Sequence, residues 1–248
     1  MNTEVAVYSG QQKKIYYLGN SVTKISLEQQ MAGQPGKMEI SYIDTGAKVD
    51  VGDVIQLSCD GRGIFSGIIF TVSYTQEETV KITAYDQIRY LKNSDTIIFS
   101  SGTLSERVKA IANGFNLRTG EIEDTGFILP QGSFDNRTLG DMIQDGINST
   151  QIGSGNLFVL RDNFGKLELK NILHMYSGLV LGEGSLATSY ELSSSIDKDT
   201  YNRIKYIMTD SNTKQQTKII EEDISTQAKW GVLQFFAKAD DKMNEAQV

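Results

Sequence analysis

Cysteine, histidine and proline are scarce in this chain of 248 residues, which has one, one and two of them, and the scarcity excludes several classes of protein. The single cysteine, Cys59, cannot form an intrachain disulfide, so the sequence predicts no disulfide framework. A Ser–His–Asp or Cys–His nucleophile would have to use the single histidine, His174, far from Cys59 in the sequence. We therefore expect His174 to be a surface residue at a strand end, and we predict no catalytic residue.

A positive net charge and long apolar runs are also missing. The net charge of −7 argues against specific nucleic-acid binding, which needs a basic face, although DNA could still pass close to an acidic or neutral surface. No apolar run approaches the roughly 18 residues of a membrane span, and the opening MNTEVAVYSG does not resemble a signal peptide. We expect a protein that does not insert into membranes and that stays in the cytosol or leaves it inside a particle.

Two patterns resemble ligand sites but have simpler interpretations. Glu121, Glu123 and Asp124 form the densest carboxylate cluster, yet metal sites need more His, Cys or carboxylate ligands, so a solvated acidic turn is expected. The sequence GEGSLA at 182–187 matches a G-x-G-x-x-A nucleotide pattern, but no helix follows it, which favours a turn. The sequence predicts no metal, no cofactor and no enzyme.

Strand patterns fill the first hundred residues. The segments alternate apolar and polar residues and are separated by turn residues, such as Gly33 to Gly36 and the Asp60-Gly61 hairpin signal. Within the sixth segment, Gly67 predicts a bulge or bend. Seven strands at this spacing predict a small antiparallel barrel over residues 1–100. The predicted strands are Glu4–Ser9, Lys14–Leu18, Val22–Glu28, Lys37–Ile43, Asp53–Cys59, Ile64–Tyr74 and Thr79–Tyr85.

The stretch from Val80 to Phe99 changes its pattern from strand to helical turn and back. Asp86 is a natural N-cap, and Ile88 and Leu91 stand three apart on one side of a single turn. We predict a structural corner that plugs one end of the barrel with Ile88 and Leu91. The residues assigned to this corner are Tyr85, Asp86, Ile88, Arg89, Tyr90 and Leu91.

After Ser100 the pattern predicts an α/β insert at 101–177. Thr103 and Glu106 form a capping box before a helix that carries Leu104, Val108, Ile111 and Phe115. Residues 118–134 are expected to be irregular, and a second helix is expected from Thr138 to about Ser149. A hairpin of Leu157–Arg161 and Lys166–Ile172 completes the insert.

Strand patterns return in residues 178–248. Ser189–Ile196, Tyr201–Met208 and Gln216–Glu221 favour strands, and Phe236–Val248 favours a helix. The chain stops without a cap, a glycine or an apolar closure, so we expect it to be a C-terminally truncated fragment. The predicted class is thus mainly β with an α/β insert.

Four segments resemble one family: VGDVIQLSCDGRGIFSGIIFTVSY (51–74), AYDQIRYLKNSDTIIF (84–99), TYNRIKYI (200–207) and DISTQAKWGVLQ (223–234). They are similar to the XkdQ/YqbQ-type hub of contractile phage tails and tailocins, distantly related to late control gene D and VgrG hubs. The resemblance implies that residues 178–248 are an incomplete second tube-type barrel with a C-terminal helix. It also implies a baseplate homotrimer that adapts a six-fold tail tube protein to a trimeric spike protein. It also implies a LysM-containing tail protein as a partner, and a place in a virion or phage-like particle assembled in the bacterial cytoplasm.

Two other functions stay open at this point. The 11 tyrosines and Trp230 could serve a β-rich cell-wall or glycan-binding tail module. A cell-wall hydrolase domain is the third possibility, although no carboxylate pair is marked by its spacing.

Overall fold

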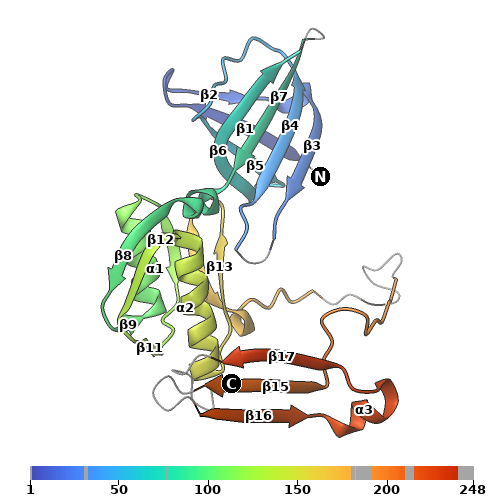
Figure 1. Cartoon of the computed structure of the whole chain (residues 1–248). Coiled ribbons are helices and arrows are strands. Elements are labelled where there is room, and N and C mark those ends of the chain that lie inside the picture. Colours follow the sequence, from blue (N-terminus) through green and yellow to red (C-terminus); the bar gives the residue numbers. More distant parts are fainter. Residues whose placement is uncertain are drawn as a thin grey trace. The chain divides into compact units, whose positions relative to one another are not determined.

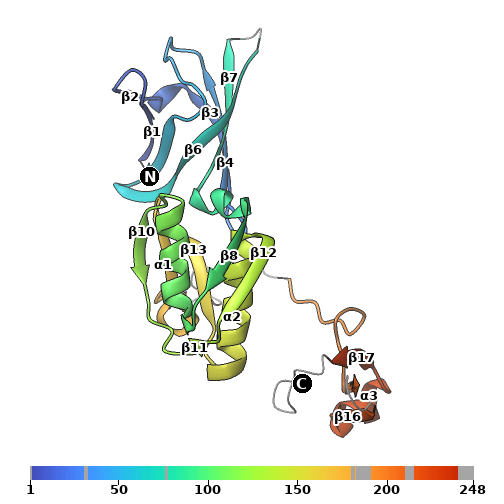
Figure 2. The ribbon, with the colours of Figure 1, turned by 60° about the vertical axis from the view of Figure 1, so that its left-hand side comes forward.

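The computed structural model describes residues 2–30, 33–75, 78–179, 182, 191–209 and 215–239 of two compact units, 1–177 and 178–248. Each unit is treated by itself. The first unit contains a curled β-sheet and a mixed α/β part, and the second contains a small sheet with one short helix (Figures 1 and 2). The prediction of a mainly β chain is confirmed. No helix in the described ranges is long and apolar enough to span a membrane.

Seven antiparallel strands form the curled sheet, in the order β2-β1-β5-β6-β7-β4-β3. No ladder among the described residues joins the two edge strands, so the sheet is an open half-barrel rather than a closed ring. All seven predicted strands are present, with bounds shifted by at most two residues. They are β1 (Thr3–Ser9), β2 (Lys14–Tyr17), β3 (Val22–Glu28), β4 (Lys37–Ile43), β5 (Val54–Cys59), β6 (Arg62–Tyr74) and β7 (Thr79–Tyr85), with the 3₁₀ turn η1 (Gly19–Ser21) before β3.

The half-barrel folds because its strands alternate, and alternation places one face of each strand inside. Ile40 lies opposite Ile82 in the β4–β7 ladder, and both are buried. The β5–β6 turn needs two residues with positive φ, and Asp60 (48°) and Gly61 (76°) supply them. The core of the half-barrel comprises Val5, Val7, Leu18, Met38, Ile40, Tyr42, Val49, Ile55, Leu57, Phe65, Ile69, Val80, Ile82 and Ala84.

The rest of the first unit, from Gln87 to His174, is a mixed structure that we call the α/β lobe. Two helices pack on short strands, and the predicted capping box at Thr103 and Glu106 is formed, with Glu106 Oε2 accepting from the Thr103 N–H at 2.9 Å. The elements of the lobe are η2 (Gln87–Lys92), β8 (Ser94–Phe99), β9 (Gly102–Thr103), α1 (Leu104–Gly114), β10 (Thr119–Ile122), β11 (Ile128–Leu129), β12 (Gly132–Thr138), α2 (Leu139–Ser154), β13 (Phe158–Asp162), β14 (Leu167–Asn171) and η3 (Ile172–His174).

The segment 118–134, expected to be irregular, instead contains two strands and the start of a third. β10 pairs with β14 in parallel, β11 pairs with β9, and β12 pairs with β8. Each partner is distant in the sequence, so local composition gave no sign of the pairing. Helix α2 also runs beyond the predicted Ser149 and ends at Gly155, whose φ of 74° suits a left-handed C-terminal cap.

The second unit has a three-stranded sheet in the order β16-β15-β17, made of β15 (Arg203–Thr209), β16 (Gln216–Glu222) and β17 (Gln234–Ala239). Helix α3 (Ile224–Trp230) joins β16 to β17. Buried Asn202 fixes this connection, because its Nδ2 donates to the Gly231 carbonyl and its Oδ1 accepts from the Leu233 N–H, each at 2.8 Å.

Two expectations for this unit are wrong. Residues 191–196 form no strand, although Ser189–Ile196 was predicted to be one. Leu192 is 85% and Ile196 42% exposed, so the alternating apolar side chains of this segment are not buried in a core. Phe236 to Ala239 is strand rather than helix, because this segment pairs in parallel with β15. Residues 240–248 of the predicted helix, and all but Gly182 of the 182–187 pattern, lie outside the described residues.

The first unit has two hydrophobic cores, and the predicted boundary at residue 100 passes through the second of them. The core of the α/β lobe includes Ile88, Leu91 and Phe99, which precede that boundary. The division into domains at 1–100, 101–177 and 178–248 stays a prediction.

Candidate functional site at the corner of the first unit

The corner between β7 and β8 is built on the carboxylate of Asp86. Its Oδ1 accepts from the Ile88 N–H at 3.0 Å, which is the predicted N-cap of the turn. Its Oδ2 accepts from the Gly36 N–H at 2.7 Å, just before β4 begins. One buried side chain thereby holds the start of η2 against the neighbouring strand of the half-barrel.

Ile88 and Leu91 are buried as predicted, at 5% and 3% exposure, but they do not plug the half-barrel. Both belong to the core of the α/β lobe, with Leu139 and Met142 of α2 among the members of that cluster. The reason is geometric, because residues three apart eclipse one another in a 3₁₀ helix and share a single face. In η2 that shared face contributes to the core of the lobe.

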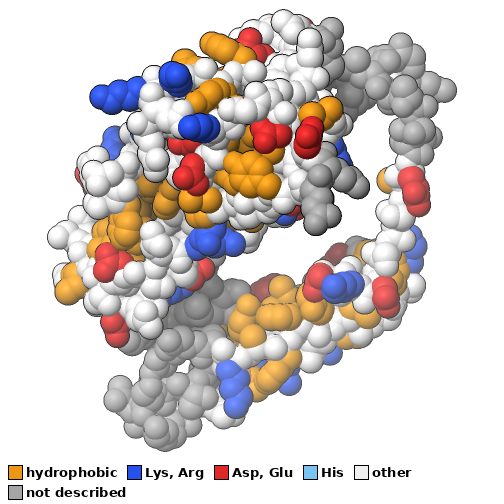
Figure 3. Space-filling model, turned by 90° about the horizontal axis from the view of Figure 1, so that it is seen from above, with side chains coloured by type: hydrophobic (Ala, Val, Ile, Leu, Met, Phe, Trp, Pro, Cys, Tyr) orange, Lys and Arg blue, Asp and Glu red, His pale blue; other side chains and the backbone are white. Residues whose placement is uncertain are grey.

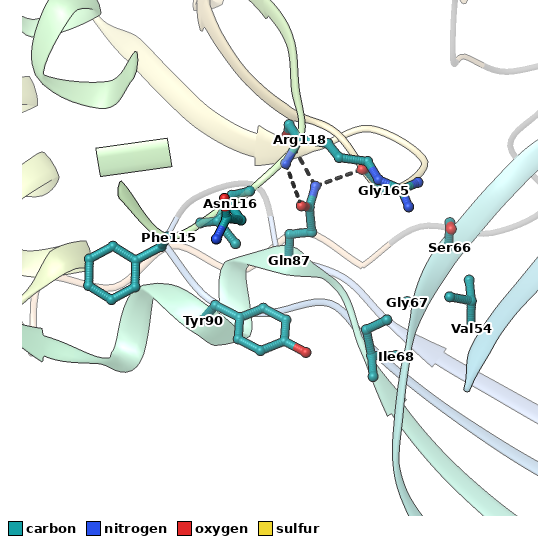
Figure 4. A pocket seen from close by; sticks show the side chains of 11 residues that line it. Val54, Ser66, Gly67, Ile68, Gln87, Tyr90, Phe115, Asn116, Arg118 and Gly165 are labelled. Carbon is teal, nitrogen blue, oxygen red and sulfur yellow. Dashed lines mark hydrogen bonds between the residues drawn. The ribbon is translucent and has the colours of Figure 1, made fainter. Parts of the chain in front are cut away.

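Gln87, which the sequence did not single out, joins η2 to two loops of the α/β lobe. Its Nε2 donates to the carbonyls of Gly165 at 2.6 Å and Arg118 at 3.2 Å, and its Oε1 accepts from the Arg118 N–H at 2.8 Å (Figure 4). A single side chain therefore bridges the segment before β10 and the β13–β14 turn. A polar residue in the first position of a turn is too common to have marked this role.

A shallow cavity of about 250 Å³ lies at the corner, lined from both the half-barrel and the lobe. Figure 4 shows Gln87 and Tyr90 of η2 beside Ile68 of β6 and Phe115 after α1. Among its lining residues there is no carboxylate, histidine or cysteine, so the cavity has no acid–base pair. The cavity is a packing defect at the contact between the half-barrel and the lobe.

The three other predicted corner residues lie at the outer surface around a β-bulge. Phe70 is the extra residue between Ile69, opposite Ala84, and Thr71, opposite Thr83. Its ring meets Tyr85 edge-on at 5.4 Å and Tyr90 at 6.0 Å, and the Arg89 guanidinium lies 5.5 Å from it. Tyr85, Arg89 and Tyr90 thus form a half-buried aromatic and cationic cluster.

The remaining candidates have structural partners. His174 lies in η3 with its ring mostly exposed, and its Nδ1 is 2.9 Å from Glu123 Oε2. Lys170 pairs with Glu121 at 2.7 Å, so two of the three clustered acids are held by basic side chains. No group of three or more potential metal-ligating side chains is found in the described part of the chain.

Replacing Gln87 by alanine should lower the free energy of unfolding of the first unit by about 1–2 kcal/mol, because it removes three hydrogen bonds and leaves their backbone partners to water. Amide hydrogen exchange should accelerate at Arg118. Gln144→Ala is the matched control, because that glutamine is exposed on α2 and its Nε2 donates to the Asn148 side chain at 2.9 Å rather than to the backbone of a neighbouring segment. Unchanged exchange at Arg118 would contradict the bridging role.

A second prediction concerns pH. Burial raises the pKa of Asp86 to about 7; the Gly36 N–H opposes the shift and the charge of Asp162 adds to it. Burial also raises the pKa of Asp162. A second cavity is lined by Asp86, Asp162 and Arg161, but the Arg161 guanidinium is paired with Glu168 at 2.9 Å.

Because the folded state binds a proton that the unfolded chain releases, the contribution of Asp86 to stability is full below about pH 4 and is lost as pH rises through 7. Thermal unfolding should therefore occur at a lower temperature at about pH 8 than at about pH 5.5. The difference should shrink in Asp86→Asn, which keeps a capping side chain. An equal difference in Asp86→Asn and the parent would show that other groups cause the dependence.

The half-barrel and α/β lobe together are a fold of phage tail proteins. The chain matches the 43 kDa tail protein of prophage MuSo2 from Shewanella oneidensis with a TM-score of 0.72 and 16% identity, over 98% of this chain and 74% of that one. It also matches a chain of the Francisella PdpA–VgrG complex with a TM-score of 0.55 and 12% identity, over 98% and 44%.

The chain belongs to the YqbQ-like family, whose model matches residues 25–248. It is 32% identical over 202 residues to YqbQ of Bacillus subtilis (strain 168), covering 81% of this chain and 61% of YqbQ. It is 29% identical over 231 residues to XkdQ of the phage-like element PBSX of the same strain, covering 90% of this chain and 70% of XkdQ. These matches confirm the family resemblance predicted from the sequence.

Proposed function

We propose that the chain is a structural component of a phage tail or phage-like particle, and that the complete protein is a baseplate hub. The observation that carries this proposal is the similarity to XkdQ, a protein of a phage-like element, over 90% of the chain. The tail-protein fold supports the same role. In this proposal the protein works by assembly and not by catalysis.

An apolar row on the outer face of the half-barrel supports an assembly role. In register across five neighbouring strands lie Ile15 of β2, Tyr8 of β1, Val54 of β5, Ile68 of β6 and Tyr85 of β7. Ile15 and Tyr8 are exposed and the other three are half-buried. Hydrophobic side chains stand at the surface between charged ones (Figure 3). Contiguous exposed apolar surface is typical of protein interfaces.

The open edges of the half-barrel support assembly into a ring. Strands β2 and β3 each leave one side without a ladder partner among the described residues, and such edges readily pair with another chain. We propose a homotrimer in the full-length protein, with subunits joined through these edges. The tail tube protein, the spike protein and a LysM-containing tail protein are its proposed partners, in a baseplate assembled in the bacterial cytoplasm.

The test is made in the bacterium that carries the gene. Particles are induced and purified by density gradient, and the tagged chain should co-purify with them. Deletion of the gene should leave no complete contractile particles, and a plasmid copy should restore them. A tagged protein that stays at the top of the gradient but sediments with purified cell walls would overturn the proposal in favour of a wall-binding module.

A further inference from the structure

Arg107 on α1 is a buried cation without a carboxylate partner. Arg107 is only 8% exposed, and it takes part in none of the ion pairs formed by the described residues. One Nη donates to the Pro130 carbonyl, and the Phe99 ring centroid lies 5.2 Å from the guanidinium carbon. The Nε–H is buried and has no hydrogen-bond partner within the described structure.

This arrangement is costly for the protein by itself. A buried charge normally has a counter-ion. The free energy lost when the charge leaves water is larger than the free energy gained from one hydrogen bond to a carbonyl and one contact with an aromatic ring. Burial lowers the pKa of Arg107, and no acidic neighbour opposes that shift. An arginine nevertheless keeps its charge, and the Nη–H donors of its planar fork that the Pro130 carbonyl does not use can serve an anion in the adjoining cavity.

The guanidinium lines a cavity of about 320 Å³ between α2 and the β11–β12 segment. Apolar side chains, those of Leu129, Phe134 and Ile152, form part of the wall. The one acidic side chain there, Asp145, is already paired with Arg137. The cavity therefore combines one uncompensated positive group with an apolar wall, and the fork of an arginine matches a carboxylate with two parallel hydrogen bonds.

We propose that this cavity binds a carboxylate next to an apolar group, as the acidic side chain or the C-terminus of a partner protein presents it. Neither the hub role nor the corner described above uses Arg107. Failure of this proposal would thus leave the proposed function untouched.

The test is an NMR titration of the isotope-labelled full chain with small probes. N-acetyl-leucine presents a terminal carboxylate, N-acetyl-glutamate α-amide presents a side-chain carboxylate, and N-acetyl-leucinamide is the neutral control. At least one of the two carboxylates should shift the amide signals of Gln131, Gly132 and Ser149, which line the cavity, and the neutral amide should not. The carboxylate probe that causes the larger amide shifts shows whether the cavity prefers a C-terminal or a side-chain carboxylate.

Arg107→Met should reduce these shifts at least tenfold at equal probe concentration. Lys109→Met is the matched control, since it removes one positive charge from the exposed side of the same helix, and it should bind like the parent. Equal shifts with the neutral amide, or shifts only outside the cavity, overturn the proposal. The comparison of the carboxylate probes with the neutral amide needs only the parent protein. It therefore tests the proposal even if Arg107→Met does not fold.

Discussion

Leu91→Ala is expected to lower the free energy of unfolding of the first unit by about 2–5 kcal/mol, through lost transfer free energy and the cavity left behind. Leu91 is buried in the core of the α/β lobe together with Ile88, both supplied by the 3₁₀ turn of the corner. The loss should therefore appear first in the lobe. Hydrogen exchange should accelerate in α1 and α2 more than in β4, whose side chains belong to the other core.

Ile98→Ala provides the matched control, because Ile98 lies in β8 close to Leu91 in sequence but is 68% exposed. Its thermal midpoint should stay close to that of the parent. If Leu91→Ala destabilised β4 and β7 as strongly as the helices, the corner would belong to the half-barrel core after all.

The half-barrel was predictable because each of its strands carries its own signal. The alternation in β4 and β7 places Ile40 and Ile82 on the buried face, and this holds for any neighbouring strand. The Asp60-Gly61 turn fixes the β5–β6 hairpin locally. The capping box of α1 is equally local, since all its atoms lie within four residues. Features decided inside a short window were found by sequence analysis.

Features decided by distant partners were not found. The lobe strands β10, β11 and β12 exist because they pair with β14, β9 and β8. β17 is a strand because it lies beside β15. The apolar pair Ile88 and Leu91 predicts a buried face. The sequence of the turn does not indicate to which of the two adjacent cores that face belongs.

We expect a fragment that is cut at residue 100 to be less stable than one that keeps the corner. A fragment starting at Ser101 would lack Ile88, Leu91 and Phe99 of the lobe core, and β8, the partner of β12. It would also lack Gln87, which bonds the backbone of Arg118 and Gly165. We expect a fragment that begins at Asp86 to be the more stable one, because it keeps the N-cap of η2.

Gly67→Ala is the substitution with the second large expected effect. The sequence predicted a bulge or bend at Gly67. The two register shifts of β6 lie on either side of it, between Gly63 and Phe65 in the β5–β6 ladder and between Ile69 and Thr71 in the β6–β7 ladder. Instead, the glycine at position 67 allows the backbone of β6 to lie close to the backbone of β7 at Tyr85. A Cβ built there would stand 2.4 Å from the Tyr85 carbonyl oxygen and 2.7 Å from the ring of Phe65.

A methyl group cannot be accommodated at 2.4 Å from a backbone oxygen, so β7 has to move where it enters the corner. Overpacking of this kind costs about 1–3 kcal/mol and sometimes more. Gly114→Ala is the matched control. Apart from its chain neighbours and the backbone of its own helix, no described atom lies within 4 Å of the new Cβ, and alanine at the end of α1 should leave the thermal midpoint unchanged or raise it. The expected result for Gly67→Ala is a clear fall in the midpoint, with faster hydrogen exchange in β6 and β7. A midpoint equal to that of Gly114→Ala would mean that the β6–β7 approach is loose enough to admit a side chain, and that the corner does not depend on it.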